Sequence, residues 1–264
     1  MTVSLRRSFF IGFWIIVSLV LAACGGLNRR SAVEHAAPVE EARQLLVSLS
    51  DANPSLSAFK GIGKIKMWNP DRSTVSERVA WIGASPESLR IEVLVSGRSM
   101  IKFSTDGRHM YFLDLRDPEP SLTKLRTIAP DLQQLASLPV KIREVVELMA
   151  GRPPAVNYSN VYLIRQTGGD GYVLVLEKWW RITEKIYLNK DRSEIEKVEV
   201  FNNNQRLRYR VIFNRMQDVR GYHVPARLTI TDEKGAGLIL DIDRYLTDVS
   251  ITPSVFVLSP PDTH

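Results

Sequence analysis

Apolar and polar residues alternate along much of the chain. The clearest alternation lies in residues 60–67, 75–81, 89–95, 206–213, 224–230 and 238–243. Successive side chains of a β-strand point to opposite faces, so these segments predict strands with one buried and one solvent-facing side, as in antiparallel sheets. Turn-forming residues separate them at short intervals. We therefore expect about eleven strands joined in sequence into a meander that curls into a half-open barrel.

The period changes to that of a helix in two places. The apolar residues of the first are Val39, Ala42, Leu45, Leu46 and Leu49. The second lies between a strand that ends near Leu115 and one that begins near Tyr158. Its apolar residues are Ile142, Val145, Val146 and Met149, with a shorter helical piece around Leu132 and Leu135 before them. Both patterns predict amphipathic helices. We expect helices near 39–50 and 130–150 to close the mouth of the curled sheet, which gives a mainly β fold with an α lid.

The chain begins with the features of a secretory signal peptide. Arg6 and Arg7 supply positive charge, and residues 9–23 are apolar except for Gly12 and Ser18. A helix needs about 20 apolar residues to cross the hydrocarbon core of a bilayer, and this run is shorter. Its length is typical of the apolar region of a signal peptide. We expect residues 1–23 to be removed.

This apolar run ends at the single cysteine of the chain. The sequence Leu21-Ala22-Ala23-Cys24 resembles the bacterial lipobox, the motif that lipoprotein signal peptidase reads. The resemblance implies a diacylglycerol on the Cys24 sulfur, cleavage just before Cys24 and acylation of the new amino group. Two or three acyl chains hold a protein firmly at a bilayer without a spanning helix. The alternative is a buried structural cysteine at the end of an uncleaved anchor helix.

The residues after the cysteine indicate in which membrane the protein is anchored and predict a flexible tether. Gly25 stands where enterobacterial lipoproteins retained in the inner membrane carry Asp. By this resemblance we expect the outer membrane, with the protein on its periplasmic face. Residues 24–38 are small, polar and without periodicity, which predicts a flexible, acylated tether. Residues 39–264 are then expected to form one folded domain.

Composition narrows the class of protein. Apolar residues make up 44% and charged residues 24% of 264 residues, the balance of an ordinary globular protein. This excludes a largely disordered chain, a coiled coil and a polytopic membrane protein. One cysteine excludes an intramolecular disulfide and a Cys-based zinc cluster. The formal net charge is only +6, and an address outside the cytoplasm further disfavours nucleic-acid binding.

The sequence contains no motif that assembles a catalytic or metal site. The four histidines lie far apart, and no hydrolase elbow or phosphate-binding glycine loop occurs. The carboxylate pairs Asp241/Asp243 and Asp114/Asp117 are expected to be solvated, the first on a strand and the second at a turn. We therefore interpret the protein as a non-enzyme with no cofactor beyond the lipid on Cys24. A lipid-modifying enzyme is the weakest alternative.

Two smaller patterns have structural interpretations. Gly61 and Gly63 are expected to let a strand bend or approach a neighbour closely. Arg206, Arg208 and Arg210 would project to one side of a strand at intervals of about 6.6–6.8 Å. They suggest either a dock for an acidic partner or lipid head groups, or an outer sheet face interleaved with acids on neighbouring strands. We favour the second interpretation.

Five segments carry a further pattern in a fixed order. They are Phe59–Lys64, Trp81, Leu138–Pro153 with its "Leu-Pro-apolar, helix, Gly-x-Pro" block, Val224–Thr229, and the tail Val255–Pro261. Together they resemble the LolA/LolB superfamily, the periplasmic carrier and outer-membrane receptor of bacterial lipoproteins. The resemblance covers roughly residues 39–261. It implies an eleven-stranded, incompletely closed barrel with a helical lid over an apolar cavity that accepts the acyl chains of a client lipoprotein.

The resemblance and the alternation together give candidate site residues. The cavity candidates are Ile65, Met67, Val79, Trp81, Ile91, Val93, Ile101, Phe103, Leu174 and Leu176, and the lid candidates are Leu45, Leu49, Ile142, Val145 and Met149. The expected partners are the membrane, the acyl chains of lipoproteins or lipids, and a periplasmic carrier protein. For each residue the alternative is ordinary core packing.

One segment departs from the pattern of the receptor. The receptor presents an exposed apolar side chain between its third and fourth strands to deliver clients to the membrane. The matching turn here is Val95-Ser96-Gly97-Arg98, with no large apolar residue at its tip. Insertion of lipoproteins is therefore less supported than binding of apolar ligands. The alternative function is a non-catalytic scaffold or sensor in an envelope assembly, with the cavity filled by its own side chains.

Overall fold

The computed structural model describes residues 38–71 and 73–260. The predicted signal peptide, the lipobox with Cys24 and the tether up to residue 37 lie outside the described residues. Within the described part, no helix is long and apolar enough to cross a bilayer.

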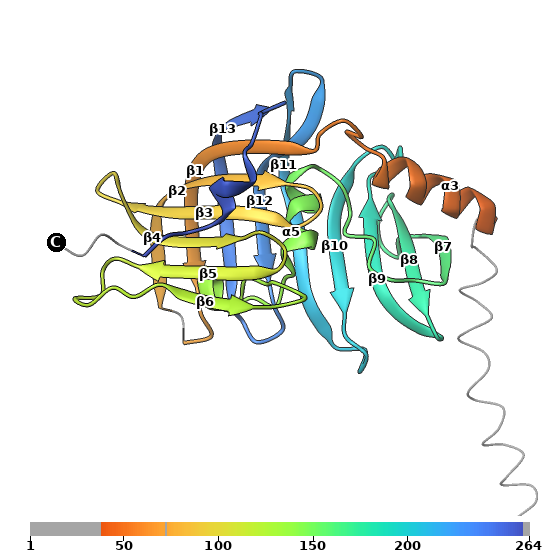
Figure 1. The fold of residues 1–264 in the computed structure, drawn as a ribbon. Coiled ribbons are helices and arrows are strands. Elements are labelled where there is room, and N and C mark those ends of the chain that lie inside the picture. Colours follow the sequence, from red (N-terminus) through yellow and green to blue (C-terminus); the bar gives the residue numbers. More distant parts are fainter. Residues whose placement is uncertain (1–37, 72, 261–264) are drawn as a thin grey trace, which may run out of the picture.

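In the described part of the chain, thirteen strands form one antiparallel sheet (Figure 1). They are β1 (Ala58–Trp68), β2 (Thr74–Ala84), β3 (Ser88–Val95), β4 (Arg98–Thr105), β5 (His109–Asp114), β6 (Thr123–Arg126), β7 (Asn160–Arg165), β8 (Tyr172–Lys178), β9 (Arg181–Leu188), β10 (Ile195–Phe201), β11 (Leu207–Val219), β12 (Tyr222–Thr231) and β13 (Gly237–Thr247). Their order across the sheet is β6-β5-β4-β3-β2-β1-β13-β12-β11-β10-β9-β8-β7. Among the described residues the edge strands β6 and β7 do not pair with each other, so the curled sheet stays open.

The prediction of a mainly β, antiparallel and unclosed fold is confirmed, but the number of strands is thirteen and not eleven. The block predicted as helical between Leu115 and Tyr158 contains α4 and α5 but also a strand that was not predicted, β6. All four residues of β6 are exposed, so this short edge strand shows no alternation of apolar and polar positions. Strand β8 shows none in its middle either, because Val173–Leu176 are buried in succession.

Strand β1 bends sharply around its two glycines. A Cβ on Gly63 would lie 2.1 Å from the backbone oxygen of Asp241 on β13, so only glycine allows this approach. A Cβ on Gly61 would lie 2.2 Å from the Trp81 ring on β2. The pairing of β1 with β13 shifts register between Ile62 and Gly63, which marks a bulge. The expected close packing at these glycines is confirmed.

Three α-helices accompany the sheet within residues 38–71 and 73–260. They are α3 (Val39–Ser50), α4 (Gln133–Ala136) and α5 (Ile142–Met149). Helix α3 packs against β7, whereas α5 contacts β3 and β12 and so lies across the inner side of the curl (Figure 1). The Glu144 carboxylate accepts the Lys141 backbone N–H at 3.0 Å, which caps the start of α5. Gly151 follows its end with a φ of +78°, a conformation that favours glycine.

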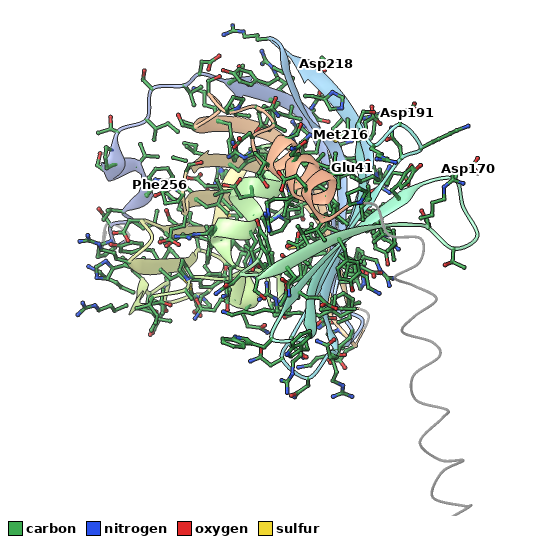
Figure 2. All side chains as sticks on the ribbon, turned by 90° about the vertical axis from the view of Figure 1, so that its right-hand side faces the viewer. Glu41, Asp170, Asp191, Met216, Asp218 and Phe256 are labelled. Carbon is green, nitrogen blue, oxygen red and sulfur yellow. The ribbon has the colours of Figure 1, made fainter. Side chains whose placement is uncertain are left out.

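The C-terminal segment runs over the outer face of the sheet. A short 3₁₀ helix, η1 (Pro253–Phe256), contacts β3. The Ser104 hydroxyl donates to the Phe256 carbonyl at 2.8 Å, and Arg90 donates to the Val255 carbonyl at 2.9 Å. Figure 2 shows Phe256 far from Glu41 of α3. The inner side is therefore covered by helices and part of the outer side by the tail.

Candidate functional site

A small apolar cavity lies between α5 and the inner side of the sheet. It has a volume of about 60 Å³. Its lining consists of Ile65, Val79, Trp81, Leu89, Ile91, Val145, Leu148, Met149, Leu228, Ile230, Leu238 and Leu240. All twelve side chains are hydrophobic, so the site selects for apolar ligand surface and offers nothing that would hold a charged molecule.

The structure separates the predicted cavity residues into two groups. Four of them, Ile65, Val79, Trp81 and Ile91, line the cavity. The other six are buried in the core but do not line it: Met67, Val93, Ile101, Phe103, Leu174 and Leu176. For the second group, core packing was the better interpretation.

The lid candidates divide in the same way. Val145 and Met149 of α5 line the cavity, while Ile142 at the start of the same helix is fully buried away from it. Leu45 and Leu49 belong to α3, which packs on β7 at another part of the sheet (Figure 1). Helix α5 alone therefore covers the cavity, and the predicted lid is smaller than expected.

Sequence reasoning missed six of the lining residues. Leu148 is the inner residue of α5 that the i, i+3, i+4 pattern left out. The five others come from β3, β12 and β13: Leu89, Leu228, Ile230, Leu238 and Leu240. Their alternation was visible in the sequence. For the four residues on β12 and β13, their place near β1 was not, because it depends on the pairing of β1 with β13.

Trp81 combines burial with an unused hydrogen-bond donor. Its ring lies against Gly61, the residue directly opposite on β1, and the residue is only 4% exposed. The indole N–H has no acceptor in the described part of the protein. A buried donor without a partner is unfavourable. Trp81 is thus the one residue lining this cavity whose side chain carries a hydrogen-bond donor.

A buried group of charged side chains holds the start of α5. Glu144 of α5 forms an ion pair with Arg208 of β11, and the side chain of Glu144 is only 6% exposed. Burial alone would lower the pKa of Arg208, but the Glu144 carboxylate outweighs this effect and the pKa is raised. This ion pair links the helix over the cavity to the sheet.

Glu184 of β9 lies beside that ion pair and is fully buried. Burial raises the pKa of the Glu184 carboxyl to about 8, and repulsion by the Glu144 carboxylate acts in the same direction. The Val156 backbone N–H donates to Glu184 Oε2 at 2.7 Å, which favours the ionised form but does not outweigh burial. Glu184 therefore carries a proton at neutral pH.

Three alternating arginines, one just before β11 and two within it, each have an acidic neighbour. Arg206 lies 3.9 Å from Glu233, Arg210 lies 2.8 Å from Glu199 on the adjacent strand, and Arg208 pairs with Glu144. For Arg210, this supports the interpretation that the arginines lie on an outer sheet face, interleaved with acids on neighbouring strands. The partner of Arg208 on α5 was not foreseen, since strand spacing gives no information about a helix.

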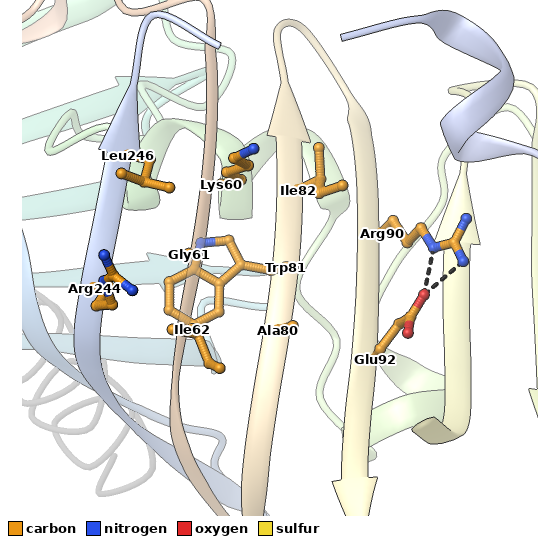
Figure 3. A pocket seen from close by; sticks show the side chains of 10 residues that line it. All are labelled: Lys60, Gly61, Ile62, Ala80, Trp81, Ile82, Arg90, Glu92, Arg244 and Leu246. Carbon is orange, nitrogen blue, oxygen red and sulfur yellow. Dashed lines mark hydrogen bonds and ion pairs between the residues drawn. The ribbon is translucent and has the colours of Figure 1, made fainter. Parts of the chain in front are cut away.

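The outer face of the sheet carries a second hollow, of about 400 Å³ (Figure 3). Its residues come from β1, β2, β3 and β13: Lys60, Gly61, Ile62, Ala80, Trp81, Ile82, Arg90, Glu92, Arg244 and Leu246. Figure 3 shows Arg90 bonded to Glu92 at one side of it. This hollow is open and mixed in polarity, so it lacks the uniform apolar lining of the inner cavity.

Among the described residues, no cluster of His, Cys, Asp and Glu could hold a metal ion. Three of the four carboxylates considered above lie beside basic side chains. Asp241 and Asp243 pair with Arg227 and Arg78, and Asp114 pairs with Arg116. These contacts agree with the expectation that the carboxylates are solvated.

Two solved structures share this architecture. A LolA superfamily protein from Nitrosomonas europaea is 14% identical, with a TM-score of 0.52 over 82% of this chain and 97% of that chain. A DUF1329 family protein from Desulfovibrio piger is 11% identical, with a TM-score of 0.51 over 83% of this chain and 97% of that chain. No protein-family model and no curated protein sequence matches the chain. The sequence resemblance is thereby confirmed for the architecture, and the chain has a LolA-like fold.

Proposed function

We propose that the protein is an outer-membrane lipoprotein on the periplasmic side whose half-barrel binds acyl chains of lipoproteins or lipids beneath α5. The observation that carries this proposal is the inner cavity, which is lined only by hydrophobic residues and covered by one amphipathic helix. A polar or charged ligand would lose hydrogen bonds to water there that the apolar lining does not replace. An acyl chain has no such hydration to lose.

Binding requires α5 to move. A volume of about 60 Å³ holds roughly two water molecules at about 30 Å³ each, whereas ligand pockets span about 300–1,000 Å³. The cavity as it stands is therefore too small for an acyl chain. Because Val145, Leu148 and Met149 form one side of it, displacing α5 would enlarge it. The Glu144–Arg208 ion pair opposes this displacement.

Trp81 provides a contact for the polar end of such a ligand. Fatty acids and acyl esters carry a carbonyl oxygen next to the apolar chain. The Trp81 indole N–H is buried and has no acceptor within the described residues, and Trp81 lines both the inner cavity and the outer hollow. A ligand carbonyl that accepts from it would relieve an unsatisfied donor, so its binding gains a hydrogen bond.

Filling the closed cavity should weaken ligand binding. We expect Val145→Phe to place its ring in the space beneath α5 and to lower the affinity for a fluorescent fatty acid by about tenfold or more, which corresponds to about 1.4 kcal/mol. Val47→Phe is the matched control, because Val47 lies on α3 and is 52% exposed. Fluorescence titration of both variants and the wild type measures the effect, with thermal unfolding to show that all three are folded. If the wild type does not bind the fluorescent fatty acid, the proposal is wrong.

The covalent anchor has its own test. The proposal expects Cys24 to be the first residue of the native protein and to carry a diacylglycerol, with its amino group acylated. Mass spectrometry of the protein isolated from its own membranes should show this added mass on the N-terminal peptide. An unmodified Cys24 thiol in that peptide would exclude the anchor.

A scaffold or sensor in an envelope assembly is the second candidate. The observation that favours it is the small volume of the cavity, which is close to that of a filled core. Crosslinking in cells distinguishes the two functions. A stoichiometric protein partner without a lipid adduct would favour the scaffold, whereas a lipid adduct on α5 would favour acyl-chain binding.

A further inference from the structure

Strands β8 and β9 are joined by an unusual turn. The turn consists of only two residues, Trp179 and Trp180, between Lys178 and Arg181, which pair with each other. Their φ angles are +52° and +65°. A two-residue hairpin turn with both φ angles positive strongly prefers Asn and Gly, because other side chains are strained there. Two tryptophans at these positions therefore cost conformational energy that the fold itself does not need.

Both indole rings also lie mostly in solvent and add little to the packing of the domain. Trp179 and Trp180 are each 78% exposed, while Trp81 is buried in the core. Exposed aromatic surface in a contiguous patch is unfavourable in water and usually marks an interaction site. Strain and exposure are independent observations, and both indicate that the two rings serve a contact outside the domain.

A third aromatic residue and two cations complete the patch. The Ser159 backbone N–H and hydroxyl both donate to the Glu177 carbonyl, which places Tyr158 beside the turn, and Tyr158 is 37% exposed. Lys178 and Arg181 flank the tryptophans. Arg181 is bonded to the Asn203 carbonyl at 2.7 Å, an interaction that leaves its positive charge unneutralised. We call Tyr158, Lys178, Trp179, Trp180 and Arg181 the aromatic tip.

We propose that the aromatic tip inserts into the interfacial region of a bilayer that contains anionic lipids. Trp and Tyr favour the level of the lipid head groups, where the ring is partly buried and its N–H or O–H stays hydrated. Lys and Arg beside them attract anionic head groups. The patch is the convex end of a hairpin, which a fluid bilayer can surround without a matching pocket. This proposal does not depend on the binding of acyl chains in the cavity.

The position of the tip is compatible with the predicted anchor. Glu41 at the start of α3 pairs with Arg192, which follows the end of β9 opposite to the tip. The eight residues of β9 span about 26 Å at about 3.3 Å each. The predicted tether of residues 24–38 reaches at most about 50 Å when extended. An anchor on Cys24 thus leaves enough length for the tip to meet the same bilayer.

The test compares the full chain with Trp179→Asn/Trp180→Gly in phosphatidylcholine vesicles with and without phosphatidylglycerol. The substitution installs the residues that this turn prefers, so the variant should unfold at a temperature no lower than the wild type. Subtracting the fluorescence emission of the variant from that of the wild type isolates the emission of Trp179 and Trp180. The N-terminal anchor does not affect this difference, because it is the same in both proteins. We expect brominated lipids to quench this difference emission by about twofold or more, aqueous iodide to quench it weakly, and phosphatidylglycerol to increase the lipid effect.

The opposite pattern overturns the proposal. If iodide quenches the difference emission strongly and brominated lipids leave it unchanged, the tip is in water. A docking site for a protein would then be the remaining interpretation, and crosslinking from the tip to another polypeptide would identify it. Trp179→Phe/Trp180→Phe provides a second baseline that keeps two apolar rings, so the result does not rest on the folding of one variant.

Discussion

Arg208→Met should destabilise the protein by about 3–5 kcal/mol, the largest effect we expect from a single substitution of a polar residue here. The reason is the Glu144 carboxylate, which is buried at the start of α5 and has Arg208 as its ion-pair partner. Removing the guanidinium leaves a buried negative charge beside the carboxyl of Glu184. The free energy of unfolding, measured by urea denaturation at pH 7, gives the effect.

Two further variants make this result specific to the ion pair. Arg206→Met changes an arginine two residues away whose side chain is 72% exposed, and it should shift stability by no more than about 0.5 kcal/mol. Adding Glu144→Gln to Arg208→Met should restore most of the lost stability, because the buried charge disappears while the amide can still accept the Lys141 N–H. If the double variant is as unstable as Arg208→Met alone, the ion pair is not the cause.

Glu184→Gln should remove a strong pH dependence of stability. The pKa of Glu184 is about 8 in the folded protein and near 4.5 in the unfolded chain. Between these values the folded state keeps a proton that the unfolded state has lost, so raising the pH favours unfolding. This contribution is fully present below pH 4.5 and is lost as the pH rises towards 8.

The size of the effect follows from the same relation. In the middle of this window each pH unit changes the free energy of unfolding by about 1.4 kcal/mol, so the wild type should lose about 3.5 kcal/mol relative to Glu184→Gln between pH 5 and pH 8. Glutamine is neutral at every pH and keeps an oxygen that can accept the Val156 N–H. Urea denaturation of both proteins at several pH values measures the difference. Parallel pH profiles would mean that Glu184 is not protonated in the folded state.

The sequence predicted local structure well where one period persists. Helix α5 occupies the block in which apolar residues recur at i, i+3, i+4 and i+7, and two of its predicted inner residues, Val145 and Met149, do line the cavity. The alternation on β1 and β2 likewise found Ile65, Val79 and Trp81. In these elements the side chain's direction follows directly from the backbone period.

Long-range pairing is what the sequence could not supply. Leu174 and Leu176 are buried, as expected of β8, but β8 lies near the far edge of the sheet from β1, so they cannot line the cavity. Leu228 and Leu238 line it because β12 and β13 follow β1 in the sheet order. No local pattern reveals which strands become neighbours.

The sequence of β9 contains a partial signal for the buried charges. Glu184 is in phase with Ile186 and Leu188 on β9, which places a carboxyl on the buried face of the strand. An acid in such a position requires a partner or a proton. That reasoning could have singled out Glu184, although not Glu144, whose burial depends on α5 meeting Arg208.

The pairing of β1 with β13 constrains how the polypeptide reaches its native state. Phe59 lies opposite Thr247, so strands near the two ends of the domain are hydrogen-bonded neighbours in the middle of the sheet. Contacts this distant in sequence slow folding, because a long loop must close before they form. During synthesis β1 has one unpaired edge until the last strand emerges, and such an edge attracts other chains. Until β13 has emerged, a nascent chain of this protein therefore exposes an edge at which aggregation can begin.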